Sequence, residues 1–251
     1  MTNERGLGPH PSCRPRLRDV SETEDSPTIP IVGGTGALGT GLAFRWAGGG
    51  IKVVLGSRDP ERAAGVAADV AGRTKGEVSG MSNADAVGTG EVVFLTVPFA
   101  SQSETMAAIR DSLEPGQIVV DCTVPLATAV GGPPTQTVGV WQGSAAQQAQ
   151  KLAPEGVTVV SALHTISAQG LADPDWVPDE DVLVCGDRKA DKARVAELIS
   201  RIDGLRPVNA GSLETSRFVE QLTPMLISIN IRYKAHSGIR ITGLPEGDPF
   251  S

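Results

Sequence analysis

Three glycines with a spacing typical of phosphate-binding turns occur early in the chain, in the run Gly34-Thr35-Gly36-Ala37-Leu38-Gly39. A short apolar segment, residues 31–32, precedes the run. Leu38, Leu42 and Trp46 then recur every four residues, which is the period of one helix face. In a strand–turn–helix unit, the first glycine permits the tight turn. The second lets backbone N–H groups approach a pyrophosphate, and the third lets helix and strand pack closely. The spacing predicts a dinucleotide site.

The next apolar segment, residues 51–55, ends in residues that select the kind of dinucleotide. Sites specific for NAD place Asp or Glu here to hold the ribose 2′-hydroxyl. This chain has Gly56, Ser57 and Arg58 instead, with Arg62 one helical turn further on. Ser57 can donate a hydrogen bond to a 2′-phosphate and Arg58 can pair with it, so we expect NADP(H). The alternative is a surface pair of arginines at the start of a solvated helix.

The elements that must position these residues alternate between strands and helices. Continuous apolar runs at residues 91–97, 117–124, 157–163 and 181–185 are typical of parallel strands covered on both faces. Helical patterns lie between them, so we expect an α/β fold with a doubly wound, mostly parallel Rossmann sheet and a smaller helical C-terminal part. Because a central strand needs its N–H groups, Pro30 is expected at the first position of the first strand.

We divide the chain into three parts. Residues 1–28 are polar, rich in proline and without periodicity, so they are expected to form a disordered N-terminal extension. Residues 29–165 form the Rossmann NADP-binding domain, and residues 166–251 form a smaller C-terminal domain. The last helix, residues 214–232 with a break at Pro224, is apolar nearly all round. It is either covered within the chain or self-associates, and a homodimer is the expected assembly.

The composition excludes several classes of function. The net charge is −7 and no basic run is present, so we expect no nucleic-acid partner. The three cysteines lack metal-site spacing, and we expect no metal and a reducing, cytoplasmic location. No segment approaches the roughly 20 apolar residues of a membrane helix, so we expect no membrane partner.

Groups suited to proton chemistry are scarce in the sequence. The only tyrosine, Tyr233, has no lysine four residues later. His164, at the end of a predicted strand, is either a general acid or a structural histidine bonded to the backbone. This scarcity suits a hydride transfer between two bound organic cofactors, which requires mainly that two rings be held face to face. The two Thr-Val-Pro strand ends (residues 96–98 and 123–125) and residues 161–168 would wall the nicotinamide side.

Several longer motifs resemble those of NADPH-dependent coenzyme F420 reductases, and the resemblance covers residues 29 to about 230. They include the glycine run, Gly56-Ser57-Arg58, Leu95-Thr96-Val97-Pro98, Ser161-Ala162-Leu163-His164-Thr165-Ile166, Val184-Cys185-Gly186-Asp187, Ile202-Asp203-Gly204-Leu205-Arg206-Pro207 and Ser216-Arg217-Phe218-Val219-Glu220-Gln221-Leu222-Thr223-Pro224. The resemblance implies reversible hydride transfer between NADP(H) and the 8-hydroxy-5-deazaflavin F420, in a homo-oligomer whose deazaflavin lies between the two domains.

The resemblance also implies which residues bind each coenzyme. In addition to the glycine run, the NADP(H) contacts would fall on Ser57, Arg58, Arg62, Val97, Ser101, Val124 and Ala168. The deazaflavin contacts would fall on His164, Thr165, Ile166 and Ser167, together with the C-terminal helix.

The sequence departs from the family pattern at two of these positions. Ser101 stands where the family has a histidine, and Ser167 stands where a proline follows His-Thr-Ile. Two further hypotheses stay open at this point. One is a related Rossmann reductase of a small imine or carbonyl with His164 as the acid, and the other is a non-catalytic NADP(H) sensor.

Overall fold

The computed structural model describes residues 27–245, 247 and 250. The predicted extension therefore lies outside the described residues, except for its last two. The prediction that it reaches residue 28 was wrong, because Thr28 already pairs with Lys52 in the sheet.

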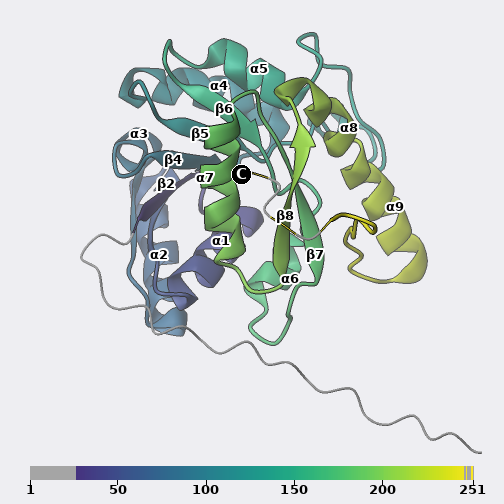
Figure 1. The fold of residues 1–251 in the computed structure, drawn as a ribbon. Coiled ribbons are helices and arrows are strands. Elements are labelled where there is room, and N and C mark those ends of the chain that lie inside the picture. Colours follow the sequence, from purple (N-terminus) through teal and green to yellow (C-terminus); the bar gives the residue numbers. More distant parts are fainter. Residues whose placement is uncertain (1–26, 246, 248–249, 251) are drawn as a thin grey trace, which may run out of the picture.

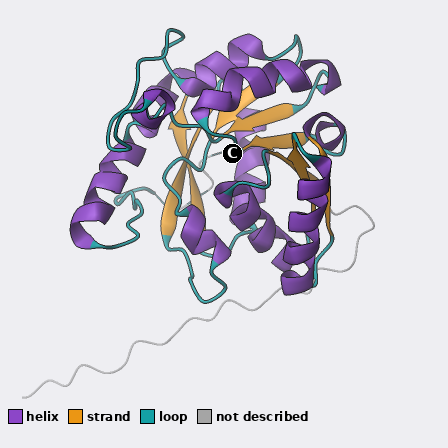
Figure 2. Ribbon diagram, turned by 180° about the vertical axis from the view of Figure 1, so that it is seen from behind, coloured by secondary structure: helices purple, strands orange, loops and turns teal. Residues whose placement is uncertain are grey.

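The described residues form one eight-stranded sheet with helices on both sides (Figures 1 and 2). The strands are β1 (Thr28–Val32), β2 (Lys52–Ser57), β3 (Val78–Ser82), β4 (Val92–Leu95), β5 (Ile118–Asp121), β6 (Thr158–Ser161), β7 (Glu180–Cys185) and β8 (Leu205–Gly211). The α-helices are α1 (Ala37–Gly48), α2 (Pro60–Thr74), α3 (Asn83–Val87), α4 (Phe99–Ile109), α5 (Ala145–Leu152), α6 (Ala168–Ala172), α7 (Lys189–Ser200), α8 (Ser216–Glu220) and α9 (Leu222–Tyr233). Three short 3-10 helices are η1 (Arg110–Ser112), η2 (Ala127–Val130) and η3 (Leu213–Thr215).

The strand order β3-β2-β1-β4-β5-β6-β7-β8 confirms the doubly wound Rossmann topology. All neighbouring strands are parallel except β6 and β7, which meet antiparallel at the single pair Ser161 and Cys185. The order reverses between β1 and β4, and ligands of such sheets bind at the carboxyl ends of the strands beside that reversal. β8 was not predicted, because Pro207 and the glycines around it conceal its strand pattern.

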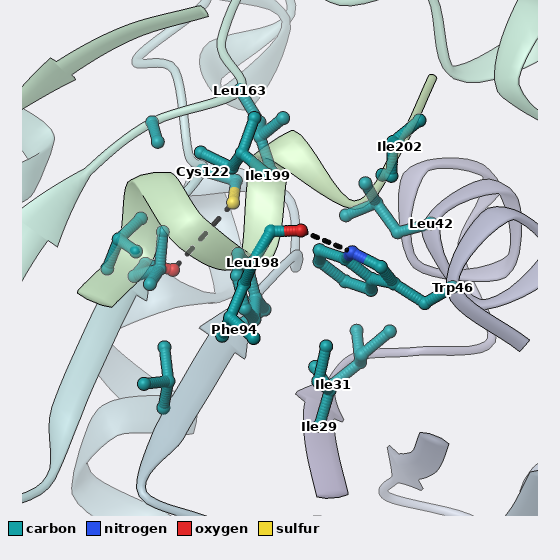
Figure 3. Packing of buried hydrophobic residues seen from close by; sticks show 14 of the residues in the cluster. Ile29, Ile31, Leu42, Trp46, Phe94, Cys122, Leu163, Leu198, Ile199 and Ile202 are labelled. Carbon is teal, nitrogen blue, oxygen red and sulfur yellow. Dashed lines mark hydrogen bonds between the residues drawn. The ribbon is translucent and has the colours of Figure 1, made fainter. Parts of the chain in front are cut away.

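Each face of the sheet has its own hydrophobic cluster, because alternate side chains of a strand point to opposite faces. Ile31 of β1 belongs to the cluster beneath α1 and α7, and its neighbour Val32 belongs to the cluster beneath α4 and α5. In the first cluster the indole of Trp46 donates from Nε1 to the carbonyl oxygen of Leu198 at 2.9 Å (Figure 3). Its ring lies 4.7 Å from that of Phe94. These contacts fix α1, and with it the glycine turn.

The predicted place of Pro30 was wrong, because Pro30 is the third residue of β1 and pairs with Val54 of β2. The pairing of β1 with β4 begins only at Ile31. The proline ring lies beside Gly90, where a side chain would come within 2.7 Å of the ring's Cδ. The missing N–H is therefore tolerated because β4 has not yet begun at this level.

The predicted break in the last helix is confirmed, since α8 ends at Glu220 and α9 begins at Leu222. Pro224 has no N–H to donate to the carbonyl of Glu220, four residues earlier. α9 lies at the outer edge of the molecule in both views (Figures 1 and 2). Within the described part of the chain, no helix combines the length and the apolar character needed to cross a lipid bilayer.

Candidate active site

The glycine turn is built by close backbone contacts. A Cβ on Gly34 would lie 2.8 Å from the carbonyl oxygen of Ile31, and one on Gly39 would lie 2.6 Å from the Cα of Gly34. Gly36 stands before the first turn of α1 without a side-chain cap, and that turn carries no acidic residue. The N–H groups at the positive end of α1 are therefore available to an anion, as the glycine spacing predicted.

A cavity of about 480 Å³ opens beside this turn. Seven of the predicted NADP(H) residues line it: Thr35, Gly36, Ser57, Arg58, Arg62, Val97 and Ser101. Gly34, Ala37, Leu38, Gly39, Val124 and Ala168 are outside its lining. The structure therefore brings together the glycine turn, the end of β2 and the start of α4.

Two positively charged side chains at this cavity lack a partner within the described part of the protein. The side chains of Arg58 and Arg62 are exposed, and neither has an ion-pair or hydrogen-bond partner among the described residues. The hydroxyl oxygen of Ser57 accepts from the backbone N–H of Asp59 at 3.1 Å, which leaves its own proton for an acceptor in the cavity. Asp59 also lines the cavity, but its carboxylate accepts from the N–H groups of Glu61 and Arg62 at the start of α2. A phosphate is the group that these donors fit.

Asn83 also belongs to this site and was missed from the sequence. Its Oδ1 accepts from the N–H of Gly33 at 3.2 Å, across 50 residues of sequence, and it packs against Gly56. Asn83 is nearly buried and lines the cavity. A polar residue directly after β3, at the carboxyl end of a parallel strand, was the signal that could have indicated it.

The two Thr-Val-Pro strand ends have different surroundings. Thr96 lines the cavity and donates from Oγ1 to the carbonyl of Val32 at 3.1 Å. Thr123 is buried, and its Oγ1 accepts from Nε2 of Gln102 at 2.8 Å. The same Nε2 donates to Asp121 at 2.9 Å. The second strand end is therefore part of a buried network rather than a wall of this cavity.

The buried network continues to α8 through two carboxyl groups. Glu220 accepts from the N–H groups of Ala145 and Ala146, at 3.0 and 3.2 Å, and so caps α5. Burial raises the pKa of Glu220 to about 8, and the charge of nearby Asp121 contributes. Burial also raises the pKa of Asp121 to about 6. This network holds α8 against the carboxyl end of the sheet.

His164 is buried, with 6% of its surface exposed, and neither ring nitrogen has a hydrogen-bond partner in the described structure. The alternative of a ring bonded to the backbone was therefore wrong. Burial lowers the pKa of His164 to about 4, so the ring is neutral at pH 7 and is not charged as a general acid would be. A buried histidine with two unpartnered nitrogens indicates a ligand.

The backbone around His164 is held in an uncommon conformation. The preceding residue, Leu163, has a φ of +66°, in the left-handed region that side chains other than glycine rarely adopt. The carbonyl of His164 accepts from Oγ1 of Thr223 in α9 at 2.9 Å. Strain of this kind is retained where the surrounding structure fixes a side chain for function.

Of the two departures from the family pattern, Ser167 has a local structural role, whereas the side chain of Ser101 makes no hydrogen bond within the described part of the chain. Ser167 is the N-cap of α6, and its Oγ accepts from the N–H of Gly170 at 3.1 Å. Ser101 lies in the first turn of α4 and lines the cavity, with its N–H donating to the carbonyl of Pro98 at 2.8 Å. Among the described residues, no group of three or more His, Cys, Asp or Glu side chains could hold a metal ion.

Comparison with known proteins agrees with this geometry. Residues 28–125 match the family model described as NADP oxidoreductase, coenzyme F420-dependent. The F420-dependent NADP reductase of Methanothermobacter thermautotrophicus is 41% identical over 223 residues, which cover 87% of this chain and 96% of that protein.

Two solved structures show the same fold. A candidate F420-dependent NADP reductase from Arthrobacter sp. FB24 superposes with a TM-score of 0.74 at 27% identity, covering 87% of this chain and 100% of that chain. The 3-hydroxyisobutyrate dehydrogenase of Mycobacterium tuberculosis, at 17% identity and a TM-score of 0.59 over 83% of this chain and 62% of its own, shares the fold alone. This chain belongs to the family of coenzyme F420-dependent NADP oxidoreductases.

Proposed function

We propose that the protein transfers a hydride reversibly between NADP(H) and the deazaflavin coenzyme F420. The observation that carries this proposal is the relatedness to an F420-dependent NADP reductase along 96% of that protein's length. The structure adds a cavity lined by Ser57, Arg58 and Arg62 and, after β6, a buried histidine with no hydrogen-bond partner among the described residues, both at the carboxyl edge of the parallel strands.

The residues around the glycine turn fit NADP(H). The exposed guanidinium groups of Arg58 and Arg62, with the hydroxyl of Ser57, suit a phosphate on the adenosine ribose, and the start of α1 suits the pyrophosphate. The proposed NADP(H) contacts are Gly34, Thr35, Gly36, Ala37, Leu38, Gly39, Ser57, Arg58, Arg62, Val97, Ser101, Val124 and Ala168.

His164, Thr165, Ile166 and Ser167 are the proposed contacts of F420, and residues 166–251 would close that side of the site. When bound, F420 supplies the carbon that gives or accepts the hydride. The neutral imidazole of His164 can donate from one nitrogen and accept at the other, so it orients a ring with polar edges. The ring of His164 is itself shielded from solvent, since only 6% of the residue is exposed.

The low pKa of His164 also argues against the first of the two alternatives. A reductase of imines or carbonyls needs a proton donor, and an imidazole with a pKa of about 4 carries almost no donor form at pH 7. An NADP(H) sensor would bind NADPH without oxidising it.

The test is to mix the purified protein with NADPH and F420 and to follow the loss of deazaflavin absorbance and fluorescence. We expect turnover that requires both coenzymes. Oxidation of NADPH by a small imine or carbonyl without F420 would support the first alternative. Tight NADPH binding without any turnover would support the sensor.

We also propose that the protein is a homodimer formed through α9. Four large apolar side chains on α8 and α9 are exposed: Phe218 by 65%, Met225 by 48%, Ile231 by 66% and Tyr233 by 72%. Only Pro224 and Leu226 of α9 are buried. Light scattering at micromolar concentration should give the mass of a dimer, and Ile231→Glu should give a monomer. A monomeric wild-type protein would contradict this assembly.

A further inference from the structure

Helix α6 is too short to be stable by itself. It has five residues, and isolated helices need about 12–15 residues before they form appreciably in water. Ser167 caps its N-terminus, but the carbonyl groups of its last turn have no partners within the helix. The N–H of Asp173, directly after the helix, donates to the carbonyl of Gly170 at 3.1 Å, and further stabilisation depends on groups supplied by other elements.

Arg45 of α1 supplies these groups. Its guanidinium donates from Nε to one carbonyl oxygen, and the two N–H groups of Nη2 are shared among three more. The acceptors are Leu171 at 2.8 Å, Gly170 at 3.0 Å, Asp173 at 2.5 Å and Trp176 at 2.7 Å. One side chain thus holds the end of α6 and the turn that follows it. A lysine could not do so, because its single ammonium lacks the planar fork of donors.

A second contact lies one turn earlier on α1. A Cβ on Gly41 would lie 2.8 Å from the Cβ of Leu171 and 3.1 Å from the carbonyl oxygen of Ala168. The missing side chain lets α6 approach the backbone of α1 directly. Arg45 therefore acts on two helices that are already in close contact.

The position of α6 matters because α6 directly follows residues 164–167, the proposed contacts of F420. The carbonyl of its first residue, Ala168, lies against Gly41 in the second turn of α1. The first turn of α1 faces the dinucleotide cavity. We propose that Arg45 is a positioning residue for the hydride-transfer site: by binding four carbonyl groups, it fixes the wall of residues 164–168 against α1. This inference rests on the proposed function, which supplies the two rings that the wall must align.

The test compares the full-length wild-type protein with Arg45→Lys and Arg45→Met. We expect the kcat for NADPH and F420 to fall by about 10- to 100-fold, because small misplacements of reacting groups have effects of this size. Adenosine 2′,5′-bisphosphate, which probes only the end at Ser57 and Arg58, should bind to both variants within about twofold of wild type. The lysine variant keeps the charge, so it remains informative if the methionine variant folds poorly.

Arg110→Met is the matched control, because Arg110 also caps a helix by donating to the carbonyl of Leu152, at the end of α5. This control should lose some thermal stability and keep the wild-type kcat. An unchanged kcat in both Arg45 variants would overturn the inference. A parallel loss of adenosine 2′,5′-bisphosphate affinity would also overturn it, because that result would indicate general unfolding.

Hydrogen exchange separates this inference from the proposed function. In the wild-type protein, bound NADPH should slow amide exchange over residues 164–172. In the Arg45 variants this protection should be lost, while the protection of the glycine turn by NADPH should remain. If the wild-type protein binds NADPH but does not reduce F420, the proposed function fails and the exchange result still decides the role of Arg45. Equal protection in wild type and variants would refute that role.

Discussion

The two ends of the proposed site, the phosphate end and the wall at residues 164–168, are built in different ways. At the phosphate end, Ser57, Arg58 and Arg62 lie within six residues of sequence, and the two arginines are exposed. At the wall, His164 is buried and is held by residues from distant parts of the chain. Arg45 is 126 residues from Leu171, Thr223 is 59 residues from His164, and Glu220 is 75 residues from Ala145. The phosphate end is therefore a set of separable contacts, whereas the wall depends on contacts among five helices: α1, α5, α6, α8 and α9.

This difference predicts different responses to substitution. Loss of one phosphate contact should weaken the binding of one coenzyme and leave the fold unchanged. Changes at the wall should alter turnover, stability or pH dependence together.

The largest effect should come from Gly39→Ala, because the added methyl would lie 2.6 Å from the Cα of Gly34. We expect NADPH binding to weaken by more than about 100-fold. Stability should fall by roughly 1–3 kcal/mol, as for other overpacked sites. Calorimetry and thermal unfolding measure the two effects. Gly65→Ala, in α2 with open space around it, is the control and should be stabilising. If Gly39→Ala bound NADPH with wild-type affinity, the role assigned to the glycine turn would be wrong.

The second-largest effect should come from Arg58→Ala. This substitution removes a charged hydrogen bond to the proposed 2′-phosphate, worth roughly 1.5–3 kcal/mol. NADPH binding should weaken by about 10- to 150-fold, and NADH binding should stay nearly unchanged. Titration of both coenzymes against wild type and variant measures this selectivity. Arg201→Ala, an exposed arginine paired with Glu197, is the control. Equal losses for NADPH and NADH would contradict the assignment of the phosphate end.

His164→Phe tests the wall and should have a smaller effect. It should weaken the interaction with F420 and stabilise the free protein. The KM for F420 should rise by about tenfold, since a neutral hydrogen bond contributes roughly 0.5–1.5 kcal/mol. The free protein should become more stable, because two buried, unpartnered nitrogens are removed. Between pH 6.5 and 4 the unfolded chain binds more protons at His164 than the folded chain, so wild type loses stability as the pH falls.

The stabilisation by His164→Phe should therefore be larger at pH 5 than at pH 7.5. Thermal unfolding at the two pH values measures it. A less stable variant with an unchanged KM would show that the histidine has only a structural role.

The smallest effect should come from Glu220→Gln. Because the pKa of Glu220 is raised to about 8, the folded protein binds more protons than the unfolded chain between pH 4.5 and 8. Wild type therefore loses stability at this group as the pH rises through that window, and glutamine does not. The Tm of the variant relative to wild type should increase by a few degrees from pH 5 to pH 9. A constant difference would contradict the raised pKa.

The sequence predicted the phosphate end and the doubly wound Rossmann sheet because both depend on patterns of neighbouring residues. A glycine spacing, a strand and two arginines are visible within 30 residues. The wall at residues 161–168 was predicted from its place at the end of a strand, but its coenzyme contacts were predicted only by resemblance. Neither Arg45 nor Asn83 stood out, because each acts on backbone groups at least 50 residues away.

Two errors have the same origin in long-range structure. Pro30 was predicted at the first position of its strand, although the late start of β4 leaves room for its ring in the middle of β1. His164 was expected either to bond the backbone or to act as an acid; the fold shows no backbone partner for its ring, and burial lowers its pKa.

The most direct test of the central claim is to follow the hydride itself. NADPH carrying deuterium at both hydrogens of the nicotinamide C4 should be mixed with the protein and F420, and the reduced deazaflavin analysed by mass spectrometry. Direct transfer between two bound rings predicts one deuterium in each molecule of reduced F420, even in ordinary water. Reduced F420 without the label, or no reduction at all, would contradict the account.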